Sequence, residues 1–248
     1  MITHRLALIA GVATALAVVP AAAAAGAGQG GYTTIDVPGA TATFTVGVND
    51  AGVVVGWYTD SHGVNQGFID RGGVFTTVDH PHAGTAAFQG TFLGSINDLG
   101  AVSGTYFNSH GKAISFAGPL GAFTTVDDPA AAPFSTFAAA INDSGVIVGG
   151  YNLFTHRVPR GFIDQAGVFT TLNDPNAGTA SGQGTAAQGI SNTGVIVGIY
   201  VDSSGAGPEP LPAMTCAQSW ASSAAAAAMA RQRSEKLSRD RHNWGAWN

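Results

Sequence analysis

The stretch that decides the fold of this chain reads Ile141-Asn-Asp-Ser-Gly-Val-Ile-Val-Gly-Gly-Tyr151. Its Asn-Asp-x-Gly segment is typical of a tight turn, because Asn and Asp bond nearby backbone and Gly accepts positive φ. The β-branched run that follows it is typical of a strand. The pattern recurs at Val48 to Tyr58, Ile96 to Tyr106 and Ile190 to Tyr200, where Ser191-Asn192-Thr193 replaces Asn-Asp-x. The chain is therefore built from repeats, and these set its architecture.

Two further motifs recur with a matching period. An aromatic-Thr-Thr-aliphatic-Asp/Asn-x-Pro motif begins at Tyr32, Phe75, Phe123 and Phe169, with spacings of 43, 48 and 46 residues. Gly-Phe-Ile-Asp stands at 67–70 and 161–164, and Ser115-Phe116 is a weaker copy. With turns between them, the motifs predict four short antiparallel strands in about 46 residues.

Four short strands in this length match one blade of a β-propeller. The sequence therefore predicts an all-β, propeller-like array of about four antiparallel four-stranded repeats. Three would lie at roughly 43–79, 91–127 and 136–173, and an incomplete fourth would start near 185. The orphan motif at Tyr32–Asp36 could complete the fourth repeat by pairing with residues 185–202. An open arc or a stacked solenoid of the same hairpins is the alternative.

As a set, these motifs resemble the bacterial extracellular repeats of the HAF family. The resemblance covers about Tyr32 to Asp202 and rests on the combination rather than on any one motif. The chain has no His-Ala-Phe triplet, and Gln66-Gly67-Phe68 and Arg160-Gly161-Phe162 are its nearest equivalents. The resemblance implies a secreted repeat protein without an established activity, and it brings no catalytic residues.

The two ends differ from the repeats. Residues 1–25 combine Arg5, an uncharged run from Leu6 to Val19 and an alanine-rich exit, which predicts a secretory signal peptide. We expect the β-repeat domain at 26–204 and a linker with an Ala-rich, basic tail at 205–248. Pro208-Glu209-Pro210, an uncharged span and then basic residues resemble a degenerate PEP-CTERM sorting signal. The tail also predicts a C-terminal helix, and its span is too poor in large aliphatic residues for a stable membrane span.

Composition excludes several classes of protein. A net charge of −5 and a pI near 5.7 argue against a nucleic-acid partner. A single cysteine, Cys216, excludes a disulfide framework and a multi-cysteine metal site. No nucleophile elbow, P-loop or calcium loop occurs. The sequence therefore assigns no catalytic, cofactor-binding or metal-ligating residue and implies no cofactor.

The polar residues that recur favour structural roles over chemistry. We expect roles in turns for His62, His110, His156, Asn49, Asn97 and Asn142. We expect structural roles for the carboxylates Asp36, Asp79 and Asp127 and for Asn173, which takes their place in the last copy. His80 and His82 are expected to lie in an exposed connector and are weak candidates for binding. Blade packing is expected of Trp57 and of the motif tyrosines Tyr58, Tyr106, Tyr151 and Tyr200. Phe75, Phe123 and Phe169 are the predicted core.

These observations favour a secreted, non-catalytic repeat protein, extracellular or at the cell surface, that acts as a binding or structural module. Its expected partners are extracellular polysaccharide or cell-surface components. The alternative is a carbohydrate-active enzyme on a β-propeller, which would need acids that break the repeat pattern and converge.

Overall fold

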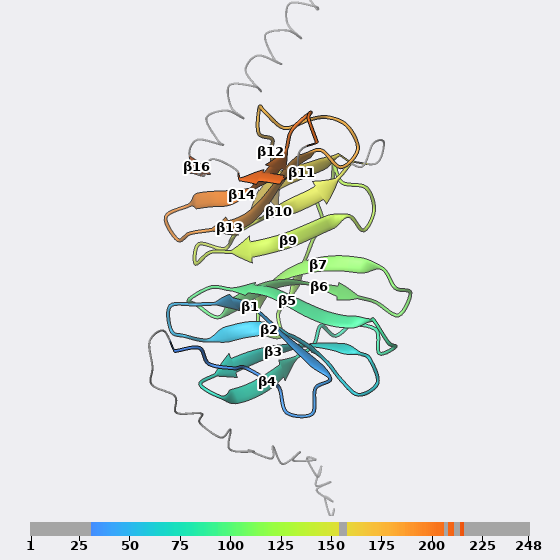
Figure 1. The fold of residues 1–248 in the computed structure, drawn as a ribbon, viewed down its shortest axis with the longest axis vertical. Helices are drawn as coiled ribbons and strands as arrows, with labels where there is room; N and C mark the ends of the chain where they lie inside the picture. Colours follow the sequence, from blue (N-terminus) through green and yellow to red (C-terminus); the bar gives the residue numbers. More distant parts are fainter. Residues whose placement is uncertain (1–30, 154–157, 206–207, 211–213, 216–248) are drawn as a thin grey trace, which may run out of the picture. The chain divides into compact units, whose positions relative to one another are not determined.

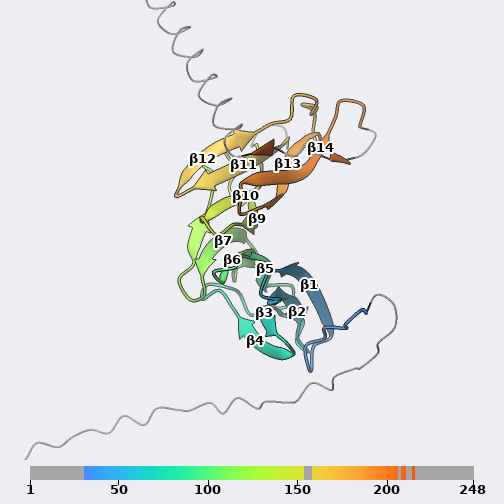
Figure 2. The same ribbon diagram turned by 90° about the vertical axis from the view of Figure 1, so that its left-hand side faces the viewer.

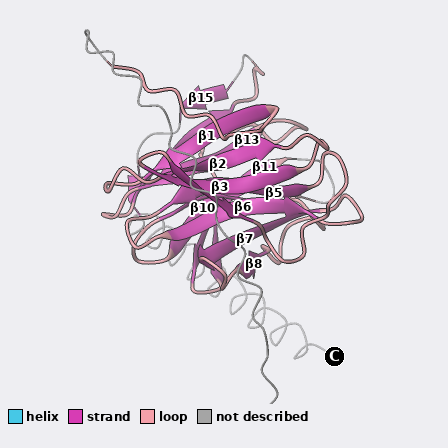
Figure 3. Cartoon of the chain, turned by 90° about the horizontal axis from the view of Figure 1, so that it is seen from below, coloured by secondary structure: helices cyan, strands magenta, loops and turns pink. Residues whose placement is uncertain are grey.

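The computed structural model describes residues 31–153, 158–205, 208–210 and 214–215. All regular structure in these residues is β, with no helix, and the strands and connecting loops are shown in Figure 3. The predicted all-β class is therefore confirmed. The predicted signal peptide, C-terminal helix and His156 lie outside the described residues. The described repeats belong to one compact unit that begins at Thr34.

Four repeats follow one another along the chain (Figure 1), at the positions that the motifs predicted. Repeat 1 contains β1 (Ala42–Val48), β2 (Val54–Thr59), β3 (Asn65–Arg71) and β4 (Val74–Val78). Repeat 2 contains β5 (Gly90–Ile96), β6 (Ala101–Phe107), β7 (Ala113–Pro119) and β8 (Thr124–Val126). Repeat 3 contains β9 (Thr136–Ile141), β10 (Val146–Asn152), β11 (Pro159–Gln165) and β12 (Val168–Leu172). Repeat 4 contains β13 (Gly184–Ile190), β14 (Val195–Val201), β15 (Pro208–Pro210) and β16 (Met214–Thr215).

Within repeats 1 to 3, consecutive strands pair antiparallel, so that each of these repeats is a meander. In repeat 4, β13 pairs with β14, and both β15 and β16 pair with β14. The register between the first two strands shifts at the same place in all four repeats, for example between Thr45 and Gly47 of β1. Such a bulge increases the local twist of the pair. The repeated sequence therefore specifies the curl of the sheet as well as its strands.

Repeats 1 and 2 join into one sheet at a point where two backbones nearly touch. Asn65 of β3 pairs parallel with Gly90 of β5, and the amide of Asn65 donates to the carbonyl of Gln89 over 2.8 Å. A Cβ on Gly90 would overlap the Asn65 carbonyl, and its φ of 118° is open to glycine. Gly184 meets Pro159 in the same way at the junction of repeats 3 and 4.

The hydrophobic core lies between neighbouring repeats rather than inside each one. Val55 and Ile69 of repeat 1 pack with Leu93 and Ile96 of repeat 2, and equivalent clusters join repeat 2 to 3 and repeat 3 to 4. Figure 2 shows the first strands of repeats 2 to 4, β5, β9 and β13, against the strands of the repeat that precedes each of them. A repeat of this kind cannot bury its apolar faces alone, so the stack provides the stability.

The predicted aromatic core needs a correction. Phe75, Phe123 and Phe169 are only half-buried, whereas the third motif supplies the fully buried rings Phe68, Phe116 and Phe162. Each phenylalanine of the aromatic-Thr-Thr motif packs against the buried ring of its own repeat, with centroids 5.7, 4.8 and 5.5 Å apart. The outermost strand of a sheet has fewer neighbours than the third, so its ring stays partly exposed.

Two expectations about the ends of the array also change. Residues 31–37 form no strand, so Tyr32–Asp36 does not complete repeat 4. Instead β14 pairs with the short strands β15 and β16. Pairing with β14 therefore continues past Ser204, where the sequence placed the start of the linker.

Candidate functional site

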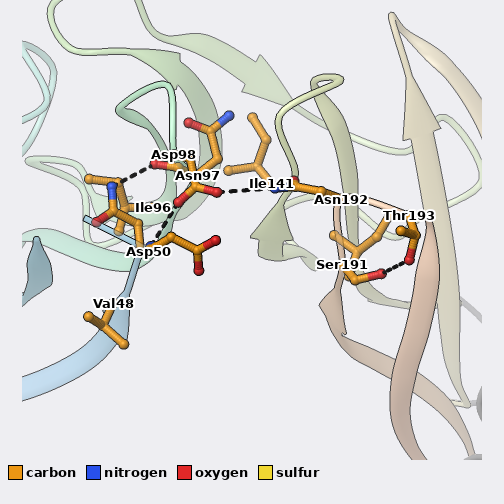
Figure 4. A pocket seen from close by; sticks show the side chains of 11 residues that line it. Val48, Asp50, Ile96, Asn97, Asp98, Ile141, Ser191, Asn192 and Thr193 are labelled. Atoms are coloured by element: carbon orange, nitrogen blue, oxygen red, sulfur yellow. Dashed lines mark hydrogen bonds between the residues drawn. The ribbon is translucent and has the colours of Figure 1, made fainter. Parts of the chain in front are cut away.

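The Asn-Asp turns of the four repeats form what we call the turn cluster, residues 49–52, 97–100, 142–145 and 191–194. Val48, Ile96, Ile141, Ile190 and turn residues of repeats 1, 2 and 4 line a hollow of about 370 Å³ (Figure 4). The hollow brings together the ends of the four first strands, β1, β5, β9 and β13. Residues of all four repeats therefore contribute to its lining.

Asparagine side chains link each turn both to itself and to the next repeat. The Oδ1 atom of Asn97 accepts the amide of Ala101 over 2.8 Å, as the sequence predicted for this turn. Its Nδ2 atom donates to the carbonyl of Asn142 over 3.0 Å. Asn49 donates to Asn97, and Asn142 donates to Ser191, in the same way. The sequence predicted only the first of these two bonds, because the second depends on how the repeats stack.

Aspartates form a second row of hydrogen bonds beside the asparagines. The amide of Asp50 donates to Asp98 Oδ1, and the amide of Asp98 donates to Asp143 Oδ1, over 2.8 and 2.9 Å. The amide of Asp143 donates to Asn192 Oδ1 over 3.0 Å. Each acceptor is thus filled by the turn of the repeat before it.

Two of the three carboxylates in the turn cluster, those of Asp98 and Asp143, are therefore engaged as hydrogen-bond acceptors. Asn192 Nδ2 donates to Asp98 Oδ2 and Asp143 Oδ2 over 3.1 and 2.8 Å, so both oxygens of each carboxylate have a donor. A general acid or base must exchange a proton with substrate, which this arrangement opposes. In the described residues, no group of three or more His, Cys, Asp or Glu side chains is placed to hold a metal ion.

The aspartates before the prolines accept hydrogen bonds from the repeat that follows them. Asp36 Oδ1 accepts the Thr43 hydroxyl over 2.8 Å, and Asp127 Oδ1 accepts the Thr136 hydroxyl over 3.1 Å. The sequence predicted bonds to the turn's own amides, but the partner is a threonine on the first strand of the following repeat. Burial raises the pKa of Asp79, and bonds from Gly67 and Thr91 offset part of that shift.

Of the two histidines in the predicted exposed connector, His82 is exposed as expected, whereas His80 is not. His80 is buried and stacks on Tyr106, with ring centroids 3.9 Å apart and planes 6° apart. Burial, and to a lesser extent His82, lowers the pKa of His80. His82 is exposed, and its amide donates to His80 Nδ1 over 3.3 Å. Only His82 is therefore available at the surface.

The turn histidines and the motif aromatics have the structural roles expected of them. The amides of His62 and His110 donate to Asp60 and Asn108, while both side chains are exposed. Trp57 stacks on Phe44 at 3.9 Å and contacts Phe92 of the next repeat at 4.9 Å. Tyr106 and Tyr151 are buried.

Two phenylalanines in the connectors are exposed, and no repeated motif marks either of them in the sequence. Phe88 is 85% exposed with φ of 66°, and Phe134 is 50% exposed with φ of 60°. Positive φ is a genuine outlier for a bulky residue. Phe88 precedes Gln-Gly-Thr, and the equivalent residue before Gln-Gly-Thr at the start of repeat 4 is Gly182, with φ of 80°. Glycine is thus the residue that this backbone favours.

Both phenylalanines lie beside a turn of the preceding repeat. The Phe88 amide donates to the carbonyl of Gly63, in the turn that carries His62. Lys112, beside His110, places its Nζ atom 5.4 Å from the centroid of the Phe134 ring. The two rings therefore occupy similar surroundings one repeat apart, each with a polar turn next to it.

Compared with known protein families, with characterised proteins and with solved structures, the chain matches none. Among the described residues, there is no helix with the length and hydropathy needed to cross a bilayer.

Proposed function

We propose that this chain is a secreted, non-catalytic repeat protein that binds extracellular polysaccharide at its connector loops. The observation that supports this proposal is that the Phe88 and Phe134 side chains are exposed although their backbones have positive φ. A left-handed backbone costs a non-glycine residue about 1–2 kcal/mol, and two rings this exposed recover little of that by packing. Strain of this kind is typical of residues kept for contact with a ligand.

A pyranose chain is the ligand whose chemistry fits two such rings. The face of an aromatic ring carries negative partial charge, and the axial C–H groups of a sugar present positive partial charge to it. Polar turns beside the rings, with His62, His110 and Lys112, can donate hydrogen bonds to sugar hydroxyls. Rings one repeat apart suit an extended polymer, and the net charge of −5 disfavours nucleic acid and anionic lipid.

The test is affinity electrophoresis of the secreted protein in gels that contain hydroxyethyl cellulose, laminarin or alginate. We expect at least one polymer to retard the wild type. Retardation by the neutral polymers would indicate stacking of sugars on the rings, whereas stronger retardation by the acidic alginate would indicate an added ionic contact with Lys112. Phe88→Gly and Phe134→Gly should each weaken retardation, and the double variant should abolish it. Phe88→Gly should unfold at an unchanged or higher denaturant concentration, because the strain is relieved.

Leu99→Ala is the matched control, because Leu99 is 76% exposed but lies in the turn cluster. It should migrate like the wild type. The proposal fails if no polymer retards the wild type, or if the double variant is retarded equally. Release of reducing sugar from a retarding polymer would favour the carbohydrate-active enzyme instead.

The setting of this function also belongs to the proposal. We assign export to residues 1–25 and surface sorting to the PEP-CTERM-like tail, and we regard the repeats as a propeller-like array of the HAF type. The charge and small-residue order of the N-terminus and the four-fold motif set support these assignments. Intact mass of the exported protein tests the first, since a chain that keeps Met1 would contradict it.

A further inference from the structure

The two ends of the repeat array expose residues whose equivalents in the inner repeats are buried. Val48 of repeat 1 is 63% exposed, while its equivalents Ile96 and Ile141 are 7% and 8% exposed and Ile190 of repeat 4 is half-buried. Thr45 is also exposed, whereas Leu93, Ala138 and Ala187 at that position are buried. We call Thr45 and Val48 the front face of repeat 1. In repeats 2 to 4, the preceding repeat covers this face.

Repeat 4 shows the opposite half of the same interface. Val197 is 49% exposed, whereas Val55 and Val148 at the equivalent position are fully buried. Those two valines belong to clusters with Leu93 and Ala187, each on the first strand of the following repeat. We call Val197 the rear face of repeat 4. It lacks a following repeat among the described residues.

The hydrogen bonds of the turn cluster end in the same way. Asp98, Asp143 and Asn192 each accept the amide of the preceding turn. Within the described part of the chain, the Asp50 side chain accepts no such bond, and the Asn192 amide donates none. Among the described residues, the row of hydrogen bonds between turns thus ends with the Asp50 carboxylate as an unused acceptor in repeat 1 and the Asn192 amide as an unused donor in repeat 4. The row of asparagine bonds stops at Ser191, which has no side-chain amide.

We propose that the rear face of repeat 4 binds the front face of repeat 1 in a second copy of this chain. The chain already makes this interface three times, and a second copy carries both halves of it. The contact would bury Val197 against Thr45 and Val48 and add an Asn192-to-Asp50 hydrogen bond. Such a head-to-tail contact gives a ring if its rotation closes and a filament if it does not. It is independent of the polysaccharide proposal.

The experiment measures mass in solution by light scattering and sedimentation, using the full secreted chain at increasing concentration. We expect wild-type protein to associate, and we expect Val48→Asp and Val197→Asp each to remain monomeric. A charge on either face would be buried without a partner in the complex. Val168→Asp is the matched control, because Val168 is 57% exposed on an internal repeat, and it should associate like the wild type.

Mixing the two variants identifies the geometry. Val48→Asp keeps its rear face and Val197→Asp keeps its front face, so together they should form a one-to-one complex and nothing larger. Circular dichroism should be the same for all variants, which separates lost association from lost folding. A wild type that stays monomeric, variants that associate by themselves, or a mixture that stays monomeric would each overturn the proposal.

Discussion

Asn97 donates its side-chain amide to the main-chain carbonyl of Asn142 over 3.0 Å, and this bond joins repeat 2 to repeat 3. The same side chain closes its own turn through Ala101. One buried residue therefore supports both a hairpin and the stacking of repeats. This double role explains why asparagine stands at the position in three of the four repeats.

The two roles of Asn97 can be separated by substitution. Asn97→Ala removes two buried hydrogen bonds, and at about 1 kcal/mol each we expect a loss of about 2 kcal/mol in unfolding free energy. Asn97→Ser should lose about half as much, because Ser191 shows that a hydroxyl can accept the Val195 amide at the equivalent place. Urea denaturation measures both. Equal stability of Asn97→Ser and wild type would mean that the bond between repeats contributes nothing.

The aromatic core makes a graded prediction. Phe116 is fully buried, so Phe116→Ala should cost about 3–5 kcal/mol. Phe123→Ala should cost less than that, because its ring is half-buried, and His110→Ala should stay within about ±0.5 kcal/mol. The midpoints of denaturant unfolding give the order. If Phe123→Ala were as costly as Phe116→Ala, the half-buried ring would be more important to the core than its exposure indicates.

Asp128 makes stability depend on pH. Its Oδ2 atom is buried without a hydrogen-bond partner. Burial first, and then the charges of Asp127 and Asp164, raises the pKa of Asp128 although the Ala130 amide opposes this. The folded state then binds more protons than the unfolded one, so this group's contribution to stability is fully present below about pH 4 and falls as pH rises through the raised pKa.

We therefore expect Asp128→Asn to melt at a higher temperature than the wild type at neutral pH. The asparagine keeps an oxygen for the Ala130 amide and carries no charge to bury. The difference between the two proteins should shrink as the pH approaches 4. Melting curves followed by circular dichroism across this range provide the measurement. A difference that is constant with pH would show that the carboxyl does not titrate in this environment.

The short strands after Ser204 predict an effect of truncation. A chain that ends at Ser204 loses β15 and β16, which pair with β14, whereas a chain that ends at Thr215 keeps them. We expect the first to melt at a lower temperature than the second, because an exposed edge of β14 has unpaired backbone groups. Both should keep β-type circular dichroism. Identical melting temperatures would mean that these strands do not stabilise repeat 4.

Particular residues show how far sequence patterns reach in this chain. The turn role of Asn97, the repeat boundaries and the strands of repeats 1 to 3 were predictable, because they depend on neighbours within a few residues. The burial of His80 was not predictable, since a histidine beside proline is typical of an exposed connector. Val37 and Asp128 share its position and are also buried, which only the stacking on the following repeat explains.

The candidate ligand-binding residues show the same division. Phe88 belongs to no repeated motif. It is a candidate ligand-binding residue because its φ is positive and because glycine stands at the equivalent position in repeat 4. By itself, the sequence determined the four-fold repeat, the all-β class and the turns, because short-range periodicity specifies strands and hairpins. Only the tertiary structure decided which repeated residues bond to the next repeat and which faces stay exposed, because both follow from how neighbouring repeats pack.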